Sequence, residues 1–254
     1  MWQRLRSALF GSQLWRSIFR HDHKDTRRGR IVAIAGNVWL HLHPPKIRRH
    51  GLRVRYSWCM GGLTFLLFLV TVVTGVYLMF FYRPTDEYAY RDMKMLMFDV
   101  PFGAISRNMH RWAAHGMVIT VMLHMYRVFL TGSYKPPREF NWVVGVALLT
   151  LTMFLGFTGY LLPWDQLSMW AVTVGTNMAS AIPFLGHEGP LASHGPVTPR
   201  YDAHALLLGG TVVGPATLLR FYVLHCIFVP IAAVLLMILH FWRVRKDGGV
   251  SGPL

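Results

Sequence analysis

Four long stretches without a charged side chain constrain this sequence more than any other feature. Three are wholly uncharged and run from Trp58 to Tyr82, from Asn141 to Trp164 and from Phe221 to Trp242. The fourth, Trp112 to Thr131, is interrupted only by Arg127. A helix of about 20 apolar residues spans the hydrocarbon core of a bilayer. We therefore predict four membrane-spanning helices, over 58–82, 110–131, 141–163 and 219–242.

The composition agrees with an all-α membrane protein. Hydrophobic residues make up 53% of the chain and charged residues only 15%. We predict a helical domain over 58–254, preceded by a basic, amphipathic extension over 1–57. Within the extension, 5–19 and 31–42 mix apolar and basic residues, which is typical of helices that lie in the membrane interface. A solvated basic tail is the alternative reading of that extension.

Basic residues are concentrated in alternate segments outside the predicted helices. The first 57 residues hold 13 Lys and Arg, the loop between the second and third helices adds two more, and the C-terminal tail adds three. The other two connections are nearly neutral. By the positive-inside rule, both termini lie on the cytoplasmic or stromal (n) side and the neutral loops on the opposite (p) side. The net charge of +15 therefore indicates an anionic lipid surface as the partner, and not nucleic acid.

Histidines recur at matching depths on two of the predicted helices. His110 and His124 are separated by 14 residues, which is a rise of about 21 Å with nearly the same facing direction. His225 and His240 are separated by 15 residues, or about 22 Å. Since both helices run from the p side to the n side, His110 faces His225 and His124 faces His240. Two imidazoles per layer can hold one haem iron, which predicts a four-helix bundle with two haems, and His115 is left as a structural residue.

Glycines and arginines accompany the histidine layers. Glycines lie 14 residues apart on the other two helices, where they would let the backbone approach a flat cofactor: Gly61, Gly75, Gly145 and Gly159. Ordinary helix packing through small residues is the alternative. Arginines near the layers could pair with anionic haem propionates or could simply extend to the membrane interface: Arg107, Arg111 and Arg127.

These motifs resemble the cytochrome b6 family, the four-helix, split type of cytochrome b. The matching stretches lie within about residues 55–254: CMGGLTFLLFLVTVVTG (59–75), FYRPT (81–85), HRW (110–112), RVFLTG (127–132), KPPREFNWVVG (135–145), TGYLLPWDQ (158–166), LLRFYVLH (218–225) and SGPL (251–254). The resemblance implies two b haems, one on His110 and His225 near the p side and one on His124 and His240 near the n side. It also implies a dimeric complex with a subunit IV-like protein, a Rieske iron–sulfur protein and a c-type cytochrome.

The resemblance implies a reaction as well. Quinol is oxidised near the p side, where one electron goes to the Rieske centre and the other crosses the bilayer through the two b haems to reduce quinone on the n side. Residues at the p-side end of the third helix would lie near the quinol: Tyr160, Pro163, Trp164 and Asp165. Arg245 would lie near the n-side haem or quinone. Cys59 matches the family's cysteine that binds a haem c by one thioether, although an inert buried thiol is the alternative.

Two further function classes compete with this one. A dihaem anchor linking a soluble dehydrogenase to quinone would lack the paired glycines and the Pro163-Trp164-Asp165 segment. A non-redox membrane scaffold would show no haem absorbance. The long basic extension favours a bacterial cytoplasmic membrane over a thylakoid. Histidines of the long connection between the third and fourth helices match no known metal-ligand spacing, so we expect them to be loop residues: His187, His194 and His204.

Overall fold

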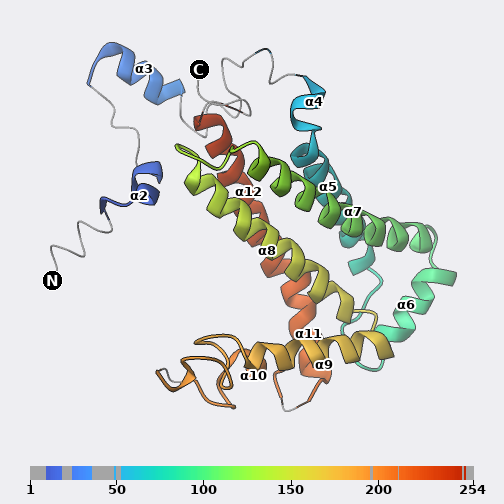
Figure 1. Cartoon of the computed structure of the whole chain (residues 1–254). Coiled ribbons are helices and arrows are strands. Elements are labelled where there is room, and N and C mark those ends of the chain that lie inside the picture. Colours follow the sequence, from blue (N-terminus) through green and yellow to red (C-terminus); the bar gives the residue numbers. More distant parts are fainter. Residues whose placement is uncertain are drawn as a thin grey trace. The chain divides into compact units, whose positions relative to one another are not determined.

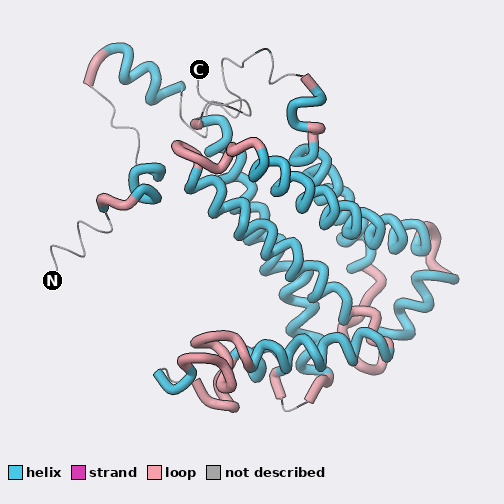
Figure 2. The backbone as a smooth tube through the Cα atoms, in the orientation of Figure 1, coloured by secondary structure: helices cyan, strands magenta, loops and turns pink. Residues whose placement is uncertain are grey.

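Four long helices dominate this computed structural model, which describes residues 10–18, 25–35, 49, 53–194, 197–210, 212–247 and 249. The four are long and apolar enough to cross a membrane: α5 (Met60–Met79), α7 (Gly103–Leu130), α8 (Glu139–Leu161) and the continuous stretch Pro215–Lys246 (Figure 1). The described residues contain no strand beyond an isolated bridge between Thr198 and Tyr201 (Figure 2). The prediction of an all-helical protein with four membrane-spanning helices is confirmed.

The fourth long helix is not uniform. It consists of α11 (Pro215–Val223), a π-helical turn, η3 (Leu224–Phe228), and α12 (Val229–Lys246). Pro215 stands at the start of α11, where its missing N–H costs nothing because the first amides of a helix have no partner within it. The π turn was not predicted.

The ends of two long helices differ from the prediction that was based on hydropathy. α7 begins at Gly103, seven residues before the predicted start at 110, because Arg107 and its neighbours favour helix without being apolar. α5 ends at Met79, short of the predicted 82, since Pro84 disfavours helical backbone in the residue before it. α8 begins directly after Pro136, Pro137 and Arg138.

Shorter helices occupy the connections and the extension. The extension contains α2 (Gln13–Ile18), α3 (Arg27–Ala35) and α4 (Val54–Ser57), so the helices predicted over 5–19 and 31–42 fall partly outside the described residues. Between α5 and α7 lies α6 (Ala89–Phe98). The long connection after α8 contains α9 (Gln166–Ser180) and α10 (Ala203–Leu208). Asp165 caps α9 by accepting a hydrogen bond from the Ser168 amide at 2.8 Å.

The chain divides into two compact units, and each takes one segment from every long helix. Unit 1 falls within Met1–Phe65, Val118–Thr150 and Ala233–Leu254, and unit 2 within Leu66–Met117 and Leu151–Ala232. In unit 1, Arg243 is fully buried and donates to the carbonyl oxygens of Ser17 and Ile18, which fastens α2 to α12.

Unit 2 holds a small apolar core beside the start of α11. Its buried members are Tyr82, Ala89, Leu161, Val172, Leu218 and Phe221. Asp92 of α6 is buried and receives hydrogen bonds from the amide and guanidinium of Arg83 at 2.6 to 3.0 Å. The Arg83 side chain keeps the pKa of the Asp92 carboxyl below its usual value, chiefly by that side-chain hydrogen bond. This pair fixes the turn that follows α5.

Candidate metal centres

Two pairs of histidine rings face one another, one pair in each unit. In unit 2, the ring centres of His110 and His225 lie 6.1 Å apart with the ring planes at 69°. In unit 1, the ring centres of His124 and His240 lie 6.4 Å apart with the planes at 83°. These are the two pairs that the spacing along the sequence predicted.

The separation of the rings suits a single metal ion between them. A ring nitrogen lies roughly 1 Å from its ring centre, so facing nitrogens leave about 4 Å, enough for two metal–imidazole bonds of about 2 Å. Within the described ranges, no group of three or more His, Cys, Asp or Glu could hold a metal ion. A metal with only two imidazoles from the protein must bring its other ligands with it, as haem iron does. The residues therefore fit haem.

Hydrogen bonds orient the rings of the unit 2 pair. Nδ1 of His110 lies 3.1 Å from the Thr74 hydroxyl oxygen. Nδ1 of His225 lies 3.1 Å from the Leu155 carbonyl oxygen and 3.2 Å from the Thr158 hydroxyl oxygen. Since a carbonyl only accepts, Nδ1 of His225 carries the proton. The lone pair is then on Nε2, the nitrogen available to a metal.

Each of the four predicted glycines lies against one of the four histidines. A Cβ atom built on Gly159 would lie 2.6 Å from Cε1 of His225, and one on Gly75 would lie 3.1 Å from Cε1 of His110. In unit 1, the distances are 3.2 Å from Gly61 to His124 and 3.7 Å from Gly145 to His240. Close approach of the helix backbone to the imidazoles therefore requires glycine most strictly at position 159.

Not every glycine of these helices is in such a position. A Cβ atom on Gly62 or Gly156 would meet no atom within 4 Å. Gly62 follows Gly61 on α5, and Gly156 precedes Gly159 by less than one turn on α8. The contact with histidine is therefore specific to the four glycines spaced 14 apart, and general packing through small residues does not explain it.

The π turn explains why the second pair of histidines is spaced by 15 residues and the first by 14. In an α-helix, 14 residues return the side chain to within about 40° of its starting direction, whereas 15 overshoot by about 60°. A π turn contains one residue more than an α turn, and His225 lies in it. The extra residue is thereby absorbed. The signal of the π turn in the sequence is the spacing of 15 residues between His225 and His240, where the other pair on one helix is spaced by 14.

The predicted arginines have different surroundings. Arg127 donates to the Tyr56 carbonyl oxygen at 2.7 Å and lies 4.6 Å from the centre of the Tyr56 ring. Arg107 donates to the Met97 sulfur at 3.3 Å, while Arg111 is exposed and Arg245 is buried. A role of these arginines toward a propionate stays a prediction.

The residues predicted near a quinol lie at the junction of α8 and α9. Tyr160 is exposed, and Pro163, Trp164 and Asp165 are half-buried. Trp164 has a left-handed φ of 53°, which breaks the helix and lets Asp165 cap α9. The carboxylate of Asp165 thus has a structural role at the start of α9 that was not predicted from the sequence.

Cys59 lies in the turn that precedes α5. It is exposed, has a left-handed φ of 52° and donates its amide to the Ser57 hydroxyl at 3.2 Å. His115, which the spacing set apart from the pairs, is exposed, and its Nδ1 lies 2.8 Å from the Arg111 carbonyl oxygen within α7.

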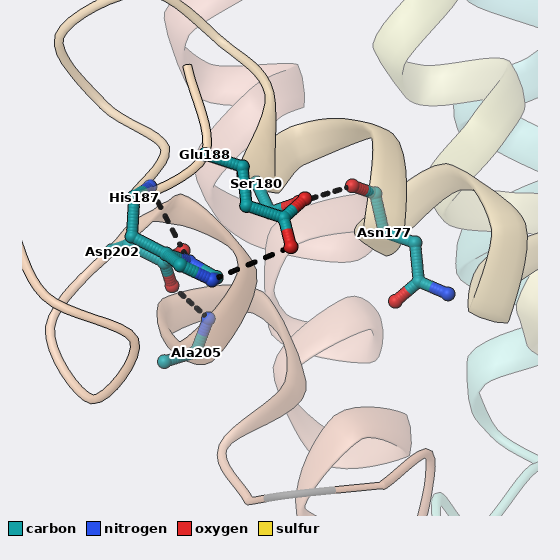
Figure 3. Close-up of polar contacts among 6 residues, drawn as sticks. All are labelled: Asn177, Ser180, His187, Glu188, Asp202 and Ala205. Atoms are coloured by element: carbon teal, nitrogen blue, oxygen red, sulfur yellow. Dashed lines mark hydrogen bonds and ion pairs between the residues drawn. The ribbon is translucent and has the colours of Figure 1, made fainter. Parts of the chain in front are cut away.

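The connection after α9 contains a polar cluster that was not predicted (Figure 3). Nδ1 of His187 lies 2.5 Å from a buried oxygen of Asp202, whose other oxygen accepts from the Ala205 amide at 2.7 Å. Glu188 accepts from the Ser180 hydroxyl at 2.7 Å. Burial opposes ionisation of Asp202, but the hydrogen bonds outweigh it and keep its pKa below the usual value. The cluster ties the loop to the ends of α9 and α10.

Four apolar helices and two facing imidazole pairs define an integral, multi-pass membrane protein equipped to hold metal groups between its helices. The chain belongs to the cytochrome b family: the family model described as Cytochrome b/b6/petB matches residues 48–248. Membership implies haem b as the bound group.

Known relatives agree over most of the chain. Proteins named Cytochrome b6 from Gracilaria tenuistipitata var. liui and Tupiella akineta are 42% and 43% identical over 224 residues, which cover 88% of this chain and 94% of each relative. A solved structure titled "Hyperthermophilic respiratory Complex III" matches with a TM-score of 0.69 and 26% identity. That match covers 89% of this chain and 55% of the other, so this chain spans little more than half of that protein.

Proposed function

We propose that this chain is the dihaem cytochrome b subunit of a quinol oxidoreductase. The two facing histidine pairs carry the proposal, because their ring separations of 6.1 and 6.4 Å suit one haem each. The names of the relatives support the quinol-oxidising class over a dehydrogenase anchor or a non-redox scaffold. When bound, the haems supply one-electron redox chemistry.

The protein's own residues bind and orient the cofactors. His110 and His225 hold one haem b, and His124 and His240 hold the other. The four glycines admit the imidazoles next to the helix backbone. Basic side chains are proposed to pair with anionic propionates or with quinone: Arg107, Arg111, Arg127 and Arg245. Arg127 already donates to the Tyr56 carbonyl oxygen, so it would bind a propionate or quinone in addition to that contact.

The proposal includes the further elements that the resemblance implies. Quinol would dock on the p side near Tyr160, Pro163, Trp164 and Asp165, and both termini would lie on the n side of a bacterial cytoplasmic membrane. The exposed Cys59 would carry haem c. The partners would be a subunit IV-like protein, a Rieske iron–sulfur protein and a c-type cytochrome in a dimeric complex that moves protons.

Reduction by quinol tests the proposal. Oxidised, detergent-purified complex is mixed with a short-chain quinol, and the b-type absorbance band is followed with time. We expect rapid reduction in the wild type and in His115→Ala, whose ring belongs to neither pair, and loss of one haem signal in His225→Ala. A complex that contains b haem but shows no quinol-dependent reduction would exclude the quinol function and leave haem binding intact.

A further inference from the structure

Two of the four glycines are preceded by a threonine that contacts the same histidine as the glycine. Thr74 precedes Gly75 on α5, and Thr158 precedes Gly159 on α8. The hydroxyl oxygens lie 3.1 Å from Nδ1 of His110 and 3.2 Å from Nδ1 of His225, respectively. Both threonines are buried, with 7% and 0% of their surface exposed. Each histidine of the unit 2 pair thus has a glycine beside its ring and a hydroxyl beside Nδ1, which is called the outer nitrogen because Nε2 is the nitrogen available to a metal.

The hydroxyl protons are already engaged with the helix backbone. Thr74 donates to the Val70 carbonyl oxygen at 2.6 Å, and Thr158 donates to the Phe154 carbonyl oxygen at 2.9 Å. A hydroxyl has one proton and two lone pairs, so each oxygen is left as an acceptor toward Nδ1–H. The donated bond polarises the oxygen and makes it a better acceptor. Both threonines therefore hold the proton on Nδ1 and the lone pair on Nε2.

The unit 1 pair differs at the same two positions. The residue before Gly61 is Met60, and the residue before Gly145 is Val144. Neither side chain carries a hydroxyl, so neither offers His124 or His240 the hydroxyl acceptor that Thr74 and Thr158 offer the unit 2 pair. Val144 is nearly isosteric with threonine and is 5% exposed, which makes the difference chemical and not spatial.

We propose that Thr74 and Thr158 are positioning residues that lower the reduction potential of the haem on His110 and His225 relative to the haem on His124 and His240. The inference rests on the proposed function, because it presupposes that both pairs bind haem. Hydrogen bonding from the outer nitrogen raises the basicity of an imidazole ligand, and a more basic ligand favours the ferric over the ferrous state. Hydrogen bonds around the ligands are one of the means by which a protein sets a haem potential.

The expected shift in midpoint potential can be worked out from known hydrogen-bond partners of metal-binding histidines. Loss of such a partner changes metal affinity or activity by about 10- to 100-fold. If one hydroxyl changes the ratio of ferric to ferrous binding about tenfold, the midpoint moves by about 59 mV for a one-electron couple. Thr158→Val should move it in the same direction, because the Thr158 hydroxyl oxygen lies 3.2 Å from Nδ1 of His225.

Redox titration of the purified complex, followed in the b-type absorbance band, tests the inference. Thr74→Val should raise the midpoint potential of one haem by about 59 mV, which corresponds to a tenfold change in the equilibrium constant of reduction. Thr74→Ser should restore the wild-type midpoint. Val144→Thr should lower the other midpoint by supplying the missing hydroxyl beside His240. The control is Thr150→Val on α8, because that hydroxyl is exposed and donates to the Val146 carbonyl oxygen at 3.0 Å.

The outcomes separate the inference from the proposed function. If both haems bind in Thr74→Val and Val144→Thr and neither midpoint moves beyond that of Thr150→Val, the inference is wrong while haem binding stands. A wild-type complex without b-type absorbance would overturn the proposed function itself. If Thr74→Val fails to assemble, Val144→Thr still decides the question, since it adds a hydroxyl and removes none.

Discussion

Gly159→Ala isolates the close approach of α8 to His225. The new Cβ would lie 2.6 Å from Cε1, 3.0 Å from Nδ1 and 3.1 Å from Nε2 of the ring. Since carbon atoms in contact are normally about 3.5–4.0 Å apart, the ring would have to retreat by roughly 1 Å. Its freedom is small, because Nδ1 is bonded to Leu155 and Thr158 and the ring must still face His110.

Gly156→Ala is the matched control on the same helix, because a Cβ there meets no atom within 4 Å. Alanine is favoured over glycine in a helix interior by up to about 1 kcal/mol, whereas overpacking of a filled site costs about 1–3 kcal/mol. Since the preference for alanine acts at both positions, the two variants should differ only by the cost of overpacking, about 1–3 kcal/mol in the free energy of unfolding, with Gly156→Ala the more stable.

The assay is haem content together with thermal unfolding. Each variant is purified in detergent, haem b per chain is measured from its pyridine complex, and the loss of helical signal is followed on heating. We expect Gly156→Ala to retain both haems and to unfold at or slightly above the wild-type Tm, and Gly159→Ala to lose one haem and unfold at a lower temperature. Equal haem content, spectrum and Tm in the two variants would refute the reasoning.

Three further predictions concern the π turn, the Asp92 carboxylate and Cys59. Deleting Ile227 from the π turn should restore a regular helix and keep both haems in the absorbance spectrum. Deleting Ile119, between His110 and His124, should instead rotate one ligand by about 100° and abolish a haem. Loss of haem in the Ile227 deletion would contradict the proposal that the π turn absorbs the extra residue. Arg83 lowers the pKa of Asp92 in the fold. The stability contributed by the ionised Asp92 carboxylate should therefore be complete above the unfolded pKa of about 3.9 and be lost as the pH falls through the lower pKa of the folded protein. Proteolysis of the 83–99 segment should show that pH dependence in the wild type and not in Asp92→Asn. Haem staining after a denaturing gel should label a band near 29.1 kDa in the wild type and not in Cys59→Ala, and an unstained wild-type band would mean that Cys59 carries no covalent haem.

The sequence predicted the four long helices and the pairing of histidines because both depend on one-dimensional quantities. Hydropathy alone marks a span in a bilayer, and a spacing of 14 residues returns a helical side chain to the same face. The start of α7 was missed because the helix continues beyond the apolar region. Its residues from Gly103 onward are too polar for a hydropathy threshold but suit a helix.

Other features depend on three-dimensional contacts that no local pattern encodes. A threonine in a membrane helix commonly bonds its own backbone, so Thr74 and Thr158 carried no signal except their repeated position before a glycine. The pairing of His187 with Asp202 joins residues 15 apart through a loop, where no periodicity fixes the geometry. The division of the extension at residue 57 stays a prediction, although α2 is fastened to α12 by Arg243.

Haem quantitation in single histidine variants tests the central claim most directly. The wild-type chain and His115→Ala should each bind two haem b groups with low-spin, bis-imidazole electron paramagnetic resonance signals. Replacing His110 or His225 by alanine should remove one signal, and replacing His124 or His240 should remove the other. If His110→Ala and His124→Ala abolish the same signal, or if either retains both haems, the assignment of one haem to each pair is wrong.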